Sequence, residues 1–390
     1  MDRSTARKLN PDTEFLRNPA ARGLCTALGD AGFNTYFVGG CVRNAVMDEP
    51  ITDIDIATDA VPDRVIELCE AAGFKCIATG IDHGTVTVVV NAQSFEVTTF
   101  RKDVATDGRR AVVAFSTDLA EDAHRRDFTM NALYANAQGI IFDPVGGYED
   151  AQARKVRFIE DAGRRIREDY LRTLRYFRFC AQYSKSDAAW DADALAGISA
   201  NLDGLETLSA ERITLELLKL LGAPNPSPAL SVMYQTGVLP KVLPGAEPTF
   251  VGPFVHFEQQ TGIAVDPIAR LAALGGYRVQ DRLRLSRRDQ RHLESICASS
   301  NSSAAPKVIG YLGGRKAGQA AIMLKAAYTN CPADIDLLAD VARGADAVFP
   351  IAASDLPHLS GSALGAELKR LKQLWLASNL SKSKAELLAP

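Results

Sequence analysis

Short apolar runs separated by glycine and polar residues dominate the first part of the chain. Runs of this length, rich in β-branched residues, predict strands; they lie at 36–38, 54–56, 83–91, 95–100, 111–115, 133–134 and 140–142. The runs at 83–91 and 95–100 predict a hairpin with its turn at Ala92-Gln93-Ser94. A helical pattern at 61–72 interrupts the strands. The polar segment 101–112, with Asp107-Gly108 and Arg109-Arg110, is predicted to be a flexible loop.

After about residue 150 the period of the apolar positions changes from two to 3.6. The stretch 160–183 predicts one helix and 209–221 a second, with Ser209 as its N-cap. The proline-rich segment 222–228 breaks the pattern, and the chain beyond it is again helical in character. The sequence therefore predicts an α+β fold, with a mixed-sheet head at residues 1–150, a helical neck at 151–222 and a helical body and tail at 223–390.

Composition is that of an ordinary globular protein. The chain has 390 residues, 47% of them hydrophobic and 23% charged, which is enough for two or three domains. Its net charge of −3 does not indicate nucleic acid, although a local basic face would suffice to bind it. The sequence shows neither a secretory signal nor an apolar run of membrane-spanning length. The seven cysteines include no CxxC pair, so we expect reduced thiols and a cytoplasmic location rather than disulfides or a zinc site.

Two acidic residues alternate at Asp53-Ile54-Asp55 in an extended apolar context. On a strand, residues i and i+2 point to the same face, so the two carboxylates are predicted to share one side of a sheet. Glu96 lies on the later hairpin strand, and three carboxylates converge if that strand is a neighbour. Such a cluster suits Mg²⁺, which carboxylates hold together with substrate phosphates. Asp53, Asp55 and Glu96 are therefore candidate catalytic residues, the first two as metal ligands; the alternative is an acidic pair in an exposed loop.

A strand, a glycine turn and a helix follow one another at 37–43. Gly39-Gly40 would let the backbone approach a phosphate, the helix N-terminus favours anions, and Arg43 adds charged donors. Neither a GxGxxG fingerprint nor a phosphate-loop lysine accompanies the turn. An ordinary strand-to-helix turn is the alternative for an isolated glycine pair.

The helical pattern from 165 to 181 divides into two faces at 100° per residue. One face is mainly charged and consists of Arg165, Glu168, Asp169, Arg172, Arg175, Tyr176 and Phe179, and the opposite face of Ile166, Tyr170, Leu174, Phe177 and Ala181. Asp169 and Arg172 are i,i+3 neighbours. Cytosine and adenine both present an amino donor beside a ring-nitrogen acceptor, whereas uracil and guanine present the reverse order. One fixed acceptor–donor pair would accept C and A and reject U and G; a solvated charged face is the alternative.

Five short motifs follow one another along the chain. They are Gly39-Gly40-Cys41-Val42-Arg43 with Asp53-Ile54-Asp55-Ile56-Ala57-Thr58, then Arg125-Arg126-Asp127-Phe128-Thr129-Met130-Asn131-Ala132-Leu133, Asp143-Pro144-Val145-Gly146-Gly147 with Asp150, Glu168-Asp169-Tyr170-Leu171-Arg172-Thr173-Leu174-Arg175 and Ser209-Ala210-Glu211-Arg212-Ile213. In order and spacing they resemble motifs A to E of the class II tRNA nucleotidyltransferase and bacterial poly(A) polymerase family. One departure is Asn44, which stands where the family usually has aspartate.

The resemblance implies a polymerase-β-like head and template-independent addition of CMP, CMP and AMP to tRNA from CTP and ATP, with Mg²⁺ as cofactor. It also implies base reading by Asp169 and Arg172, and a loop at 101–112 that helps to switch specificity from C to A. Arginines suit phosphate, and an aspartate can accept a hydrogen bond from a ribose 2′-hydroxyl; by resemblance Asp127 selects ribonucleotides, although a surface ion pair is the alternative. The remaining candidates for holding the nucleotide are Gly40, Arg43, Arg126, Arg175 and Arg178.

Two rival functions stay open at this point. His83-Gly84-Thr85-Val86-Thr87 is similar to the CCA-adding branch, yet a poly(A) polymerase or an enzyme that adds only part of CCA is closely related. A non-catalytic RNA-binding module is the rival of another class, and the retained acidic pair argues against it. No HD-type phosphohydrolase signature is present, so we expect no added hydrolase activity, and the sequence implies neither a membrane nor a protein partner.

Overall fold

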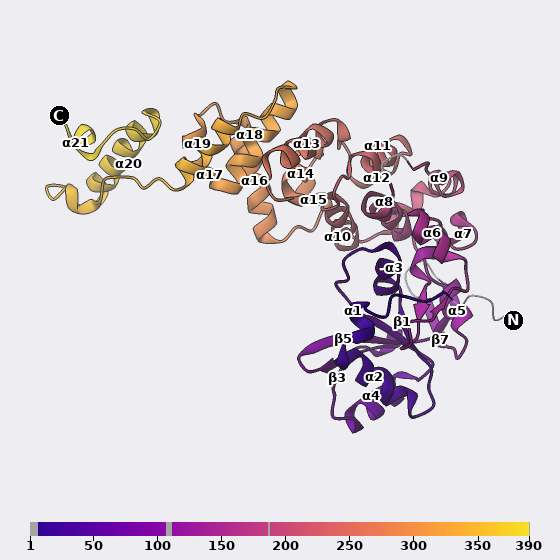
Figure 1. Ribbon diagram of the computed structural model, residues 1–390. Coiled ribbons are helices and arrows are strands. Elements are labelled where there is room, and N and C mark those ends of the chain that lie inside the picture. The colour runs from indigo at the N-terminus through magenta and orange to yellow at the C-terminus, as the bar shows by residue number, and fades with distance from the viewer. Residues whose placement is uncertain (1–6, 107–110, 186–187, 390) are drawn as a thin grey trace. The chain divides into compact units, whose positions relative to one another are not determined.

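The structure is a computed structural model that describes residues 7–106, 111–185 and 188–389. The chain divides into two compact units, Met1–Leu208 and Ser209–Pro390 (Figure 1). Within the described residues no helix is long and apolar enough to cross a bilayer.

A seven-stranded mixed sheet forms the centre of the first unit, which confirms the predicted α+β head. Its strand order is β3-β4-β5-β2-β1-β8-β9, and β2 and β5 are parallel while the other neighbouring pairs are antiparallel. The strands are β1 Thr35–Val38, β2 Asp55–Thr58, β3 Lys75–Gly80, β4 Thr85–Val90, β5 Gln93–Thr99, β8 Tyr134–Ala135 and β9 Ile141–Phe142.

Alternation along the strands separates a covered face from a polar face. Helices α2 (Pro19–Gly29) and α4 (Pro62–Ala71) pack against β4, where Val86, Val88 and Val90 are buried. The intervening residues of β4 are less buried, and the hydroxyl groups of Thr85 and Thr98 lie 3.1 Å apart on this other face. Because side chains alternate along a strand, the burial of one face leaves the other free to carry polar groups.

Two local predictions in the head are wrong. The hairpin turn lies at Asn91 and Ala92 rather than at residues 92–94, because both residues have positive φ angles of 50° and 63°, as a tight two-residue turn requires. The first part of the segment predicted as a loop is instead strand β6 (Arg101–Thr106), which pairs with β7 (Ala111–Phe115), a strand that the sequence did predict. Asp107, Gly108, Arg109 and Arg110 lie outside the described residues.

The single helix predicted at 160–183 is two helices. α7 ends at Glu168 and α8 begins at Leu171, because Asp169 has the extended angles φ −155° and ψ 105°. Tyr176 and Phe179, which the helical pattern placed on the charged face, are buried at 1% and 4% exposure. The helices of this unit are α1 Glu14–Arg17, α2, α3 Gly40–Met47, α4, α5 Leu119–His124, α6 Gly147–Ala153, α7 Ala162–Glu168, α8 Leu171–Tyr183 and α9 Ala192–Ser199.

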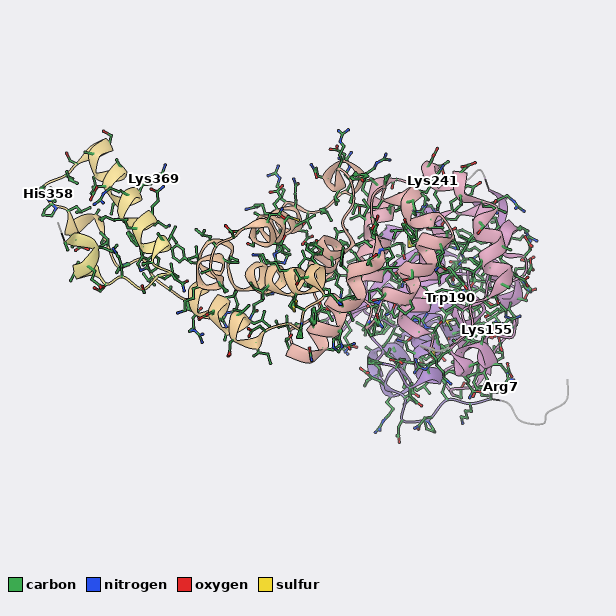
Figure 2. All side chains as sticks on the ribbon, turned by 90° about the horizontal axis from the view of Figure 1, so that it is seen from above. Arg7, Lys155, Trp190, Lys241, His358 and Lys369 are labelled. Carbon is green, nitrogen blue, oxygen red and sulfur yellow. The ribbon has the colours of Figure 1, made fainter. Side chains whose placement is uncertain are left out.

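The described part of the second unit is helical, as predicted. Ser209 is the N-cap of α10, and its hydroxyl accepts a hydrogen bond from the Arg212 amide. The helices are α10 Ala210–Leu221, α11 Ser227–Gln235, α12 Val238–Val242, α13 Val251–Thr261, α14 Pro267–Leu274, α15 Val279–Arg282, α16 Arg287–Asn301, α17 Pro306–Gly313, α18 Arg315–Thr329, α19 Ile335–Ala345, α20 Gly361–Ala377 and α21 Lys384–Leu388. Polar side chains such as Lys369 project from α20 (Figure 2), while Trp375 anchors a small core beneath it.

Candidate active site

The parallel pairing of β2 and β5 brings two of the three candidate carboxylates together. Asp55, the first residue of β2, is directly paired with Glu96 on β5. Asp53 lies outside the strand, in the segment that precedes it, so the alternation argument does not apply to it as predicted. Its exposed carboxylate accepts a hydrogen bond of 3.1 Å from the Thr52 hydroxyl. Neither aspartate forms an ion pair with any residue that the structure describes.

Electrostatics at Asp55 reflect this crowding. Burial raises the pKa of its carboxyl from 3.8 to about 6, the Glu96 carboxylate adds to the rise, Arg126 opposes it, and Asp53 contributes a smaller increase. Among the described residues no group of three acidic, histidine or cysteine side chains is arranged so that it could hold a metal ion by itself. The donors fit a divalent cation nevertheless, because hard carboxylate oxygens lie at one strand end and Mg²⁺ commonly takes only one or two carboxylates plus substrate phosphates.

The glycine turn lies at the end of β1. Gly39 has φ 68° and donates its amide to the Leu133 carbonyl at 3.0 Å, and α3 begins at Gly40. A side-chain carbon built on Gly39 would lie 3.5 Å from the Arg126 Nη1 atom and 3.6 Å from the Asn131 carbonyl oxygen. The turn therefore needs glycine for its backbone angles, and it brings the backbone close to the guanidinium of Arg126.

Arg43 is buried in a polar network. Its guanidinium donates to the Asn44 side-chain oxygen at 3.1 and 2.9 Å, to the Asn131 side-chain oxygen, and to the Tyr183 hydroxyl at 2.7 Å. The Asn44 amide in turn donates to the Pro50 carbonyl at 2.7 Å. The side-chain amide of Asn44 therefore acts both as an acceptor, through its oxygen, and as a donor, through its nitrogen. This double role gives a physical reason for asparagine where the family usually has aspartate.

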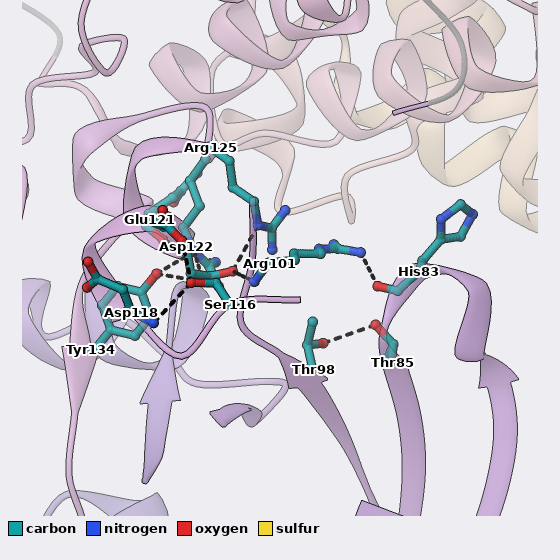
Figure 3. A network of polar contacts seen from close by, with 12 residues as sticks. His83, Thr85, Thr98, Arg101, Ser116, Asp118, Glu121, Asp122, Arg125 and Tyr134 are labelled. Atoms are coloured by element: carbon teal, nitrogen blue, oxygen red, sulfur yellow. Dashed lines mark hydrogen bonds and ion pairs between the residues drawn. The ribbon is translucent and has the colours of Figure 1, made fainter. Parts of the chain in front are cut away.

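Asp122 was not predicted as a functional residue, yet it is the centre of the polar cluster in Figure 3. It lies on α5 at 1% exposure, and its carboxylate accepts hydrogen bonds from Arg125 Nε at 2.8 Å, from Arg126 Nη2 at 3.0 Å and from the Tyr134 hydroxyl at 2.7 Å. Burial alone would raise the pKa of Asp122, but Arg126 and Arg125 beside it hold that pKa well below its ordinary value. The i,i+3 and i,i+4 spacing to Arg125 and Arg126 is the local signal that could have marked this residue, whereas its contact with Tyr134 on β8 has no local signal.

Asp127 and Arg175 form a partly buried ion pair rather than a surface pair. Arg175 Nε and Nη2 lie 2.7 and 2.6 Å from Asp127 Oδ2, and the Asp127 carboxylate is 9% exposed. Its other oxygen accepts from the Asn131 amide at 2.9 Å and from the Phe128 backbone amide at 2.8 Å. Burial acts to raise the pKa of Asp127, but Arg175 and these hydrogen bonds lower it to about 2.

The break between α7 and α8 positions the predicted base-reading pair. Asp169 accepts the Leu171 backbone amide at 3.1 Å, and Arg172 lies in the first turn of α8. Arg172 Nη1 donates to Glu168 at 2.7 Å and to the Arg165 carbonyl at 2.8 Å, and Nη2 donates to the Arg125 carbonyl at 3.2 Å. Arg172 therefore joins motif D to motif B. Glu168, which the sequence placed on the charged face and in motif D without a role, is the residue that orients Arg172.

Arg178 and motif C complete the candidate set. Arg178 and Arg43 both lie over the Phe179 ring, at 4.5 and 5.2 Å from its centroid, and burial together with this neighbouring cation lowers the pKa of Arg43. In motif C, Asp143 accepts the backbone amides of Gly147 and Tyr148 at 2.7 and 3.0 Å. These contacts secure the N-terminus of α6 and indicate a structural task for this motif.

Two family models match separate parts of the chain. The family model described as the poly A polymerase head domain matches residues 35–157, and one described as a probable RNA and SrmB-binding site of polymerase A matches 191–250. The mitochondrial CCA tRNA nucleotidyltransferase 1 of Mus musculus is 31% identical over 99% of this chain and 92% of its own length. A CCA-adding enzyme of Geobacillus thermodenitrificans is 42% identical over 58% of this chain and 54% of its own.

Solved structures show the same likeness along most of the chain. The crystal structure of the Bacillus stearothermophilus CCA-adding enzyme in complex with CTP covers 93% of this chain and 94% of its own, with a TM-score of 0.76 and 29% identity. The Thermotoga maritima CCA-adding enzyme complexed with tRNA covers 98% of both chains at a TM-score of 0.67; at 18% identity it shows a shared fold.

Proposed function

The chain belongs to the family of CCA tRNA nucleotidyltransferases, which are template-independent RNA nucleotidyltransferases, and we propose that it adds CMP, CMP and AMP from CTP and ATP to the 3′ end of tRNA. The observation that carries this proposal is the register of β2 and β5, which pairs Asp55 with Glu96 at a strand end next to the glycine turn and Arg126. Acidic residues and cationic donors at one place suit a triphosphate that must be both bound and attacked.

The family depends on a divalent metal, and we propose that the ion is Mg²⁺, held by Asp53 and Asp55 with Glu96 as the third catalytic carboxylate. When bound, such an ion offsets the charge of the phosphates and favours ionisation of the attacking hydroxyl group. The carboxylates of the chain orient the two reactants in line. The 3′-hydroxyl group of the RNA gives its proton to solvent, its oxygen bonds to the α-phosphorus of the nucleotide, the bond from that phosphorus to the β-phosphate bridging oxygen breaks, and pyrophosphate leaves.

Cationic groups around the carboxylates would hold the nucleotide. The backbone at Gly40 begins α3, and Arg126 lies beside the neighbouring Gly39, so the turn and the guanidinium can both approach phosphate oxygens. Asp127 has one oxygen on Arg175 and the other on Asn131, a fixed orientation that suits an acceptor for the ribose 2′-hydroxyl. Arg43, Arg175 and Arg178 complete the proposed nucleotide-binding set.

Asp169 and Arg172 would read the base. The extended backbone at Asp169 and the helical turn at Arg172 put an acceptor and a donor at one helix start, and Glu168 fixes the arginine. An amino donor beside a ring-nitrogen acceptor, as in C and A, satisfies such a pair, whereas U and G leave it unpaired. We further propose that residues 151–222 act as a neck and 223–390 as a body and tail that bind the tRNA, and that the protein is cytoplasmic, consistent with its seven free cysteines.

Incorporation assays test this function directly. Purified protein is given a tRNA that lacks CCA, with CTP alone, ATP alone or both, and the products are sequenced. We expect CC from CTP alone and complete CCA from the mixture. Untemplated poly(A) on generic RNA with CTP ignored would contradict CCA addition. Asp55→Ala should abolish incorporation while tRNA binding persists, and activity that survives this change would exclude the proposed metal site.

A further inference from the structure

Two residues without a proposed role enclose the guanidinium of Arg126. Asp122 and Tyr134 are both buried, at 1% and 0% exposure, whereas 19% of the surface of the Arg126 side chain is exposed to solvent. Arg126 Nε donates to the Tyr134 hydroxyl at 3.0 Å, and Nε and Nη2 lie 3.3 and 3.0 Å from Asp122 Oδ2. The Tyr134 hydroxyl donates to the same carboxylate oxygen at 2.7 Å. One buried oxygen therefore fixes the arginine and the tyrosine together.

The rest of the guanidinium points toward the reaction site. Its Nη1 atom lies 3.5 Å from the Asn131 carbonyl and close to Gly39 at the glycine turn. Tyr134 belongs to β8, where it is paired with Val38, the residue directly before that turn. Arg126 therefore has one edge held by Asp122 and Tyr134 and another directed at the turn.

Holding an arginine in this way matters for catalysis. An arginine side chain carries about 2 kcal/mol of rotamer entropy, which binding must otherwise overcome when a ligand orders it. A buried carboxylate and a hydroxyl group that fix the orientation in advance remove that cost at the moment of binding. A guanidinium edge aimed at a phosphate is also the geometry in which arginine binds anions best.

We propose that Asp122 and Tyr134 are positioning residues that orient Arg126 toward the triphosphate of the incoming nucleotide. This inference rests on the proposed function, since it assigns the anchor of a group in that site. CTP and ATP share the triphosphate, so losing the anchor that Asp122 and Tyr134 form should weaken the binding of both nucleotides equally. A fault in base reading at Asp169 would instead affect them unequally.

Tyr134→Phe is the sharpest test, because it removes one hydroxyl group and keeps the ring that packs in the head. Asp122→Asn is the second variant; since Asp122 also accepts hydrogen bonds from Arg125 Nε and the Arg101 backbone amide, its effect should be broader (Figure 3). Tyr36→Phe is the matched control, since this ring packs edge-on against Tyr134 at a centroid distance of 6.3 Å in the same core cluster.

The measurements are steady-state kinetics, equilibrium binding of CTP and ATP, and inhibition by inorganic pyrophosphate. For Tyr134→Phe we expect about a tenfold loss of kcat/KM for both nucleotides, carried mainly by KM, with a similar rise in the pyrophosphate inhibition constant. Tyr36→Phe should leave all three unchanged. In a double-mutant cycle with Arg126→Lys, the two losses should fall well short of additive, because both act on the same guanidinium.

Each contrary result has a definite meaning. Additive losses, an effect restricted to one nucleotide, an equal loss in Tyr36→Phe, or no loss at all would overturn the positioning role. The proposed function has its own readout in the same experiment, because it fails if the unaltered protein incorporates neither nucleotide into tRNA. Equilibrium binding of CTP and ATP does not require turnover, so the anchor is tested even in that case.

Discussion

Replacing Asp55 by asparagine should raise the stability of the metal-free protein while it destroys activity. Burial, with the neighbouring Glu96 carboxylate, raises the pKa of Asp55 from 3.8 to about 6. The folded state therefore holds the proton more tightly than the unfolded state does. Stability falls as the pH rises from about 4 to about 6, and above that range the folded protein bears the full cost of an ionised, crowded carboxylate.

The size of this cost follows from the shift. A change from 3.8 to about 6 corresponds to about 3 kcal/mol, at about 1.4 kcal/mol per pKa unit. That figure is an upper limit, because the carboxylate is only partly buried and water screens part of the repulsion. Asparagine has nearly the same shape and no charge, so we expect Asp55→Asn to gain about 2 kcal/mol at pH 8 and almost nothing at pH 4.

Urea unfolding of EDTA-treated protein at pH 4, 6 and 8 measures this difference. Asp53→Asn is the matched control: its carboxylate is exposed, so we expect a change within about 0.5 kcal/mol even though activity should also be lost. Adding Mg²⁺ should then stabilise the unaltered protein but not Asp55→Asn. If Asp55→Asn is no more stable than the unaltered protein at pH 8, the carboxylate is not strained, and the electrostatic description of the site is wrong.

Three other predictions concern separate parts of the chain. Helix α16 carries three exposed arginines, Arg287, Arg288 and Arg291, that form no ion pair with an acidic side chain among the described residues. We expect these arginines to contact tRNA phosphates. Changing them to glutamine should weaken tRNA binding, measured between 50 and 200 mM salt, and leave CTP binding unchanged. The slope of the logarithm of the tRNA-binding constant against the logarithm of the salt concentration should become shallower by about one for each arginine that neutralises a phosphate. Gly147→Ala should destabilise by about 3 kcal/mol in thermal unfolding, because its new carbon would lie 2.0 Å from the Thr129 carbonyl oxygen, whereas Gly365→Ala, in open space within α20, should stabilise by about 0.5–1 kcal/mol. Arg175 and hydrogen bonds hold the pKa of Asp127 at about 2 against the effect of burial, so the stability that this carboxylate contributes is lost as the pH falls from about 4 to 2. Asp127→Asn should therefore be less stable than the unaltered protein at neutral pH, and the difference in unfolding free energy should shrink over that interval in acid unfolding.

The parts of the fold that depend on local pattern could be predicted from the sequence. The apolar runs located β1, β2, β4 and β5 to within a residue or two, and Ser209 marked the start of α10. The sequence also predicted that Asp55 and Glu96 would lie close together if their strands were neighbours. The two strands do pair, and side chains directly opposite each other on one sheet face meet. Periodicity carries this information because it reports which face is buried.

The break at Asp169 shows where periodicity fails. The segment contains neither proline nor glycine between Arg164 and Tyr183, and the apolar positions of α7 and α8 remain in phase across the break. Ile166 and Leu174 are both buried, so one repeating pattern is compatible with either one helix or two. The loop prediction over residues 101–106 was wrong for a related reason, because a strand need not have an alternating apolar face to pair its backbone.

Side-chain networks explain why the candidate site was only partly foreseen. The sequence identified cations such as Arg43, Arg126 and Arg172, but not all of the acceptors that orient them. Tyr183 lies far along the chain from Arg43, and Asp122, although it is close to Arg126 in sequence, belongs to none of the motifs. A site that binds a polyanion must hold several positive charges close together before the ligand arrives. Protein acceptors make that tolerable in a partly buried site, since each fixes one edge of a guanidinium and compensates its desolvation. The resemblance therefore indicates which residues meet the nucleotide, while the buried acceptors determine how those residues are presented to it.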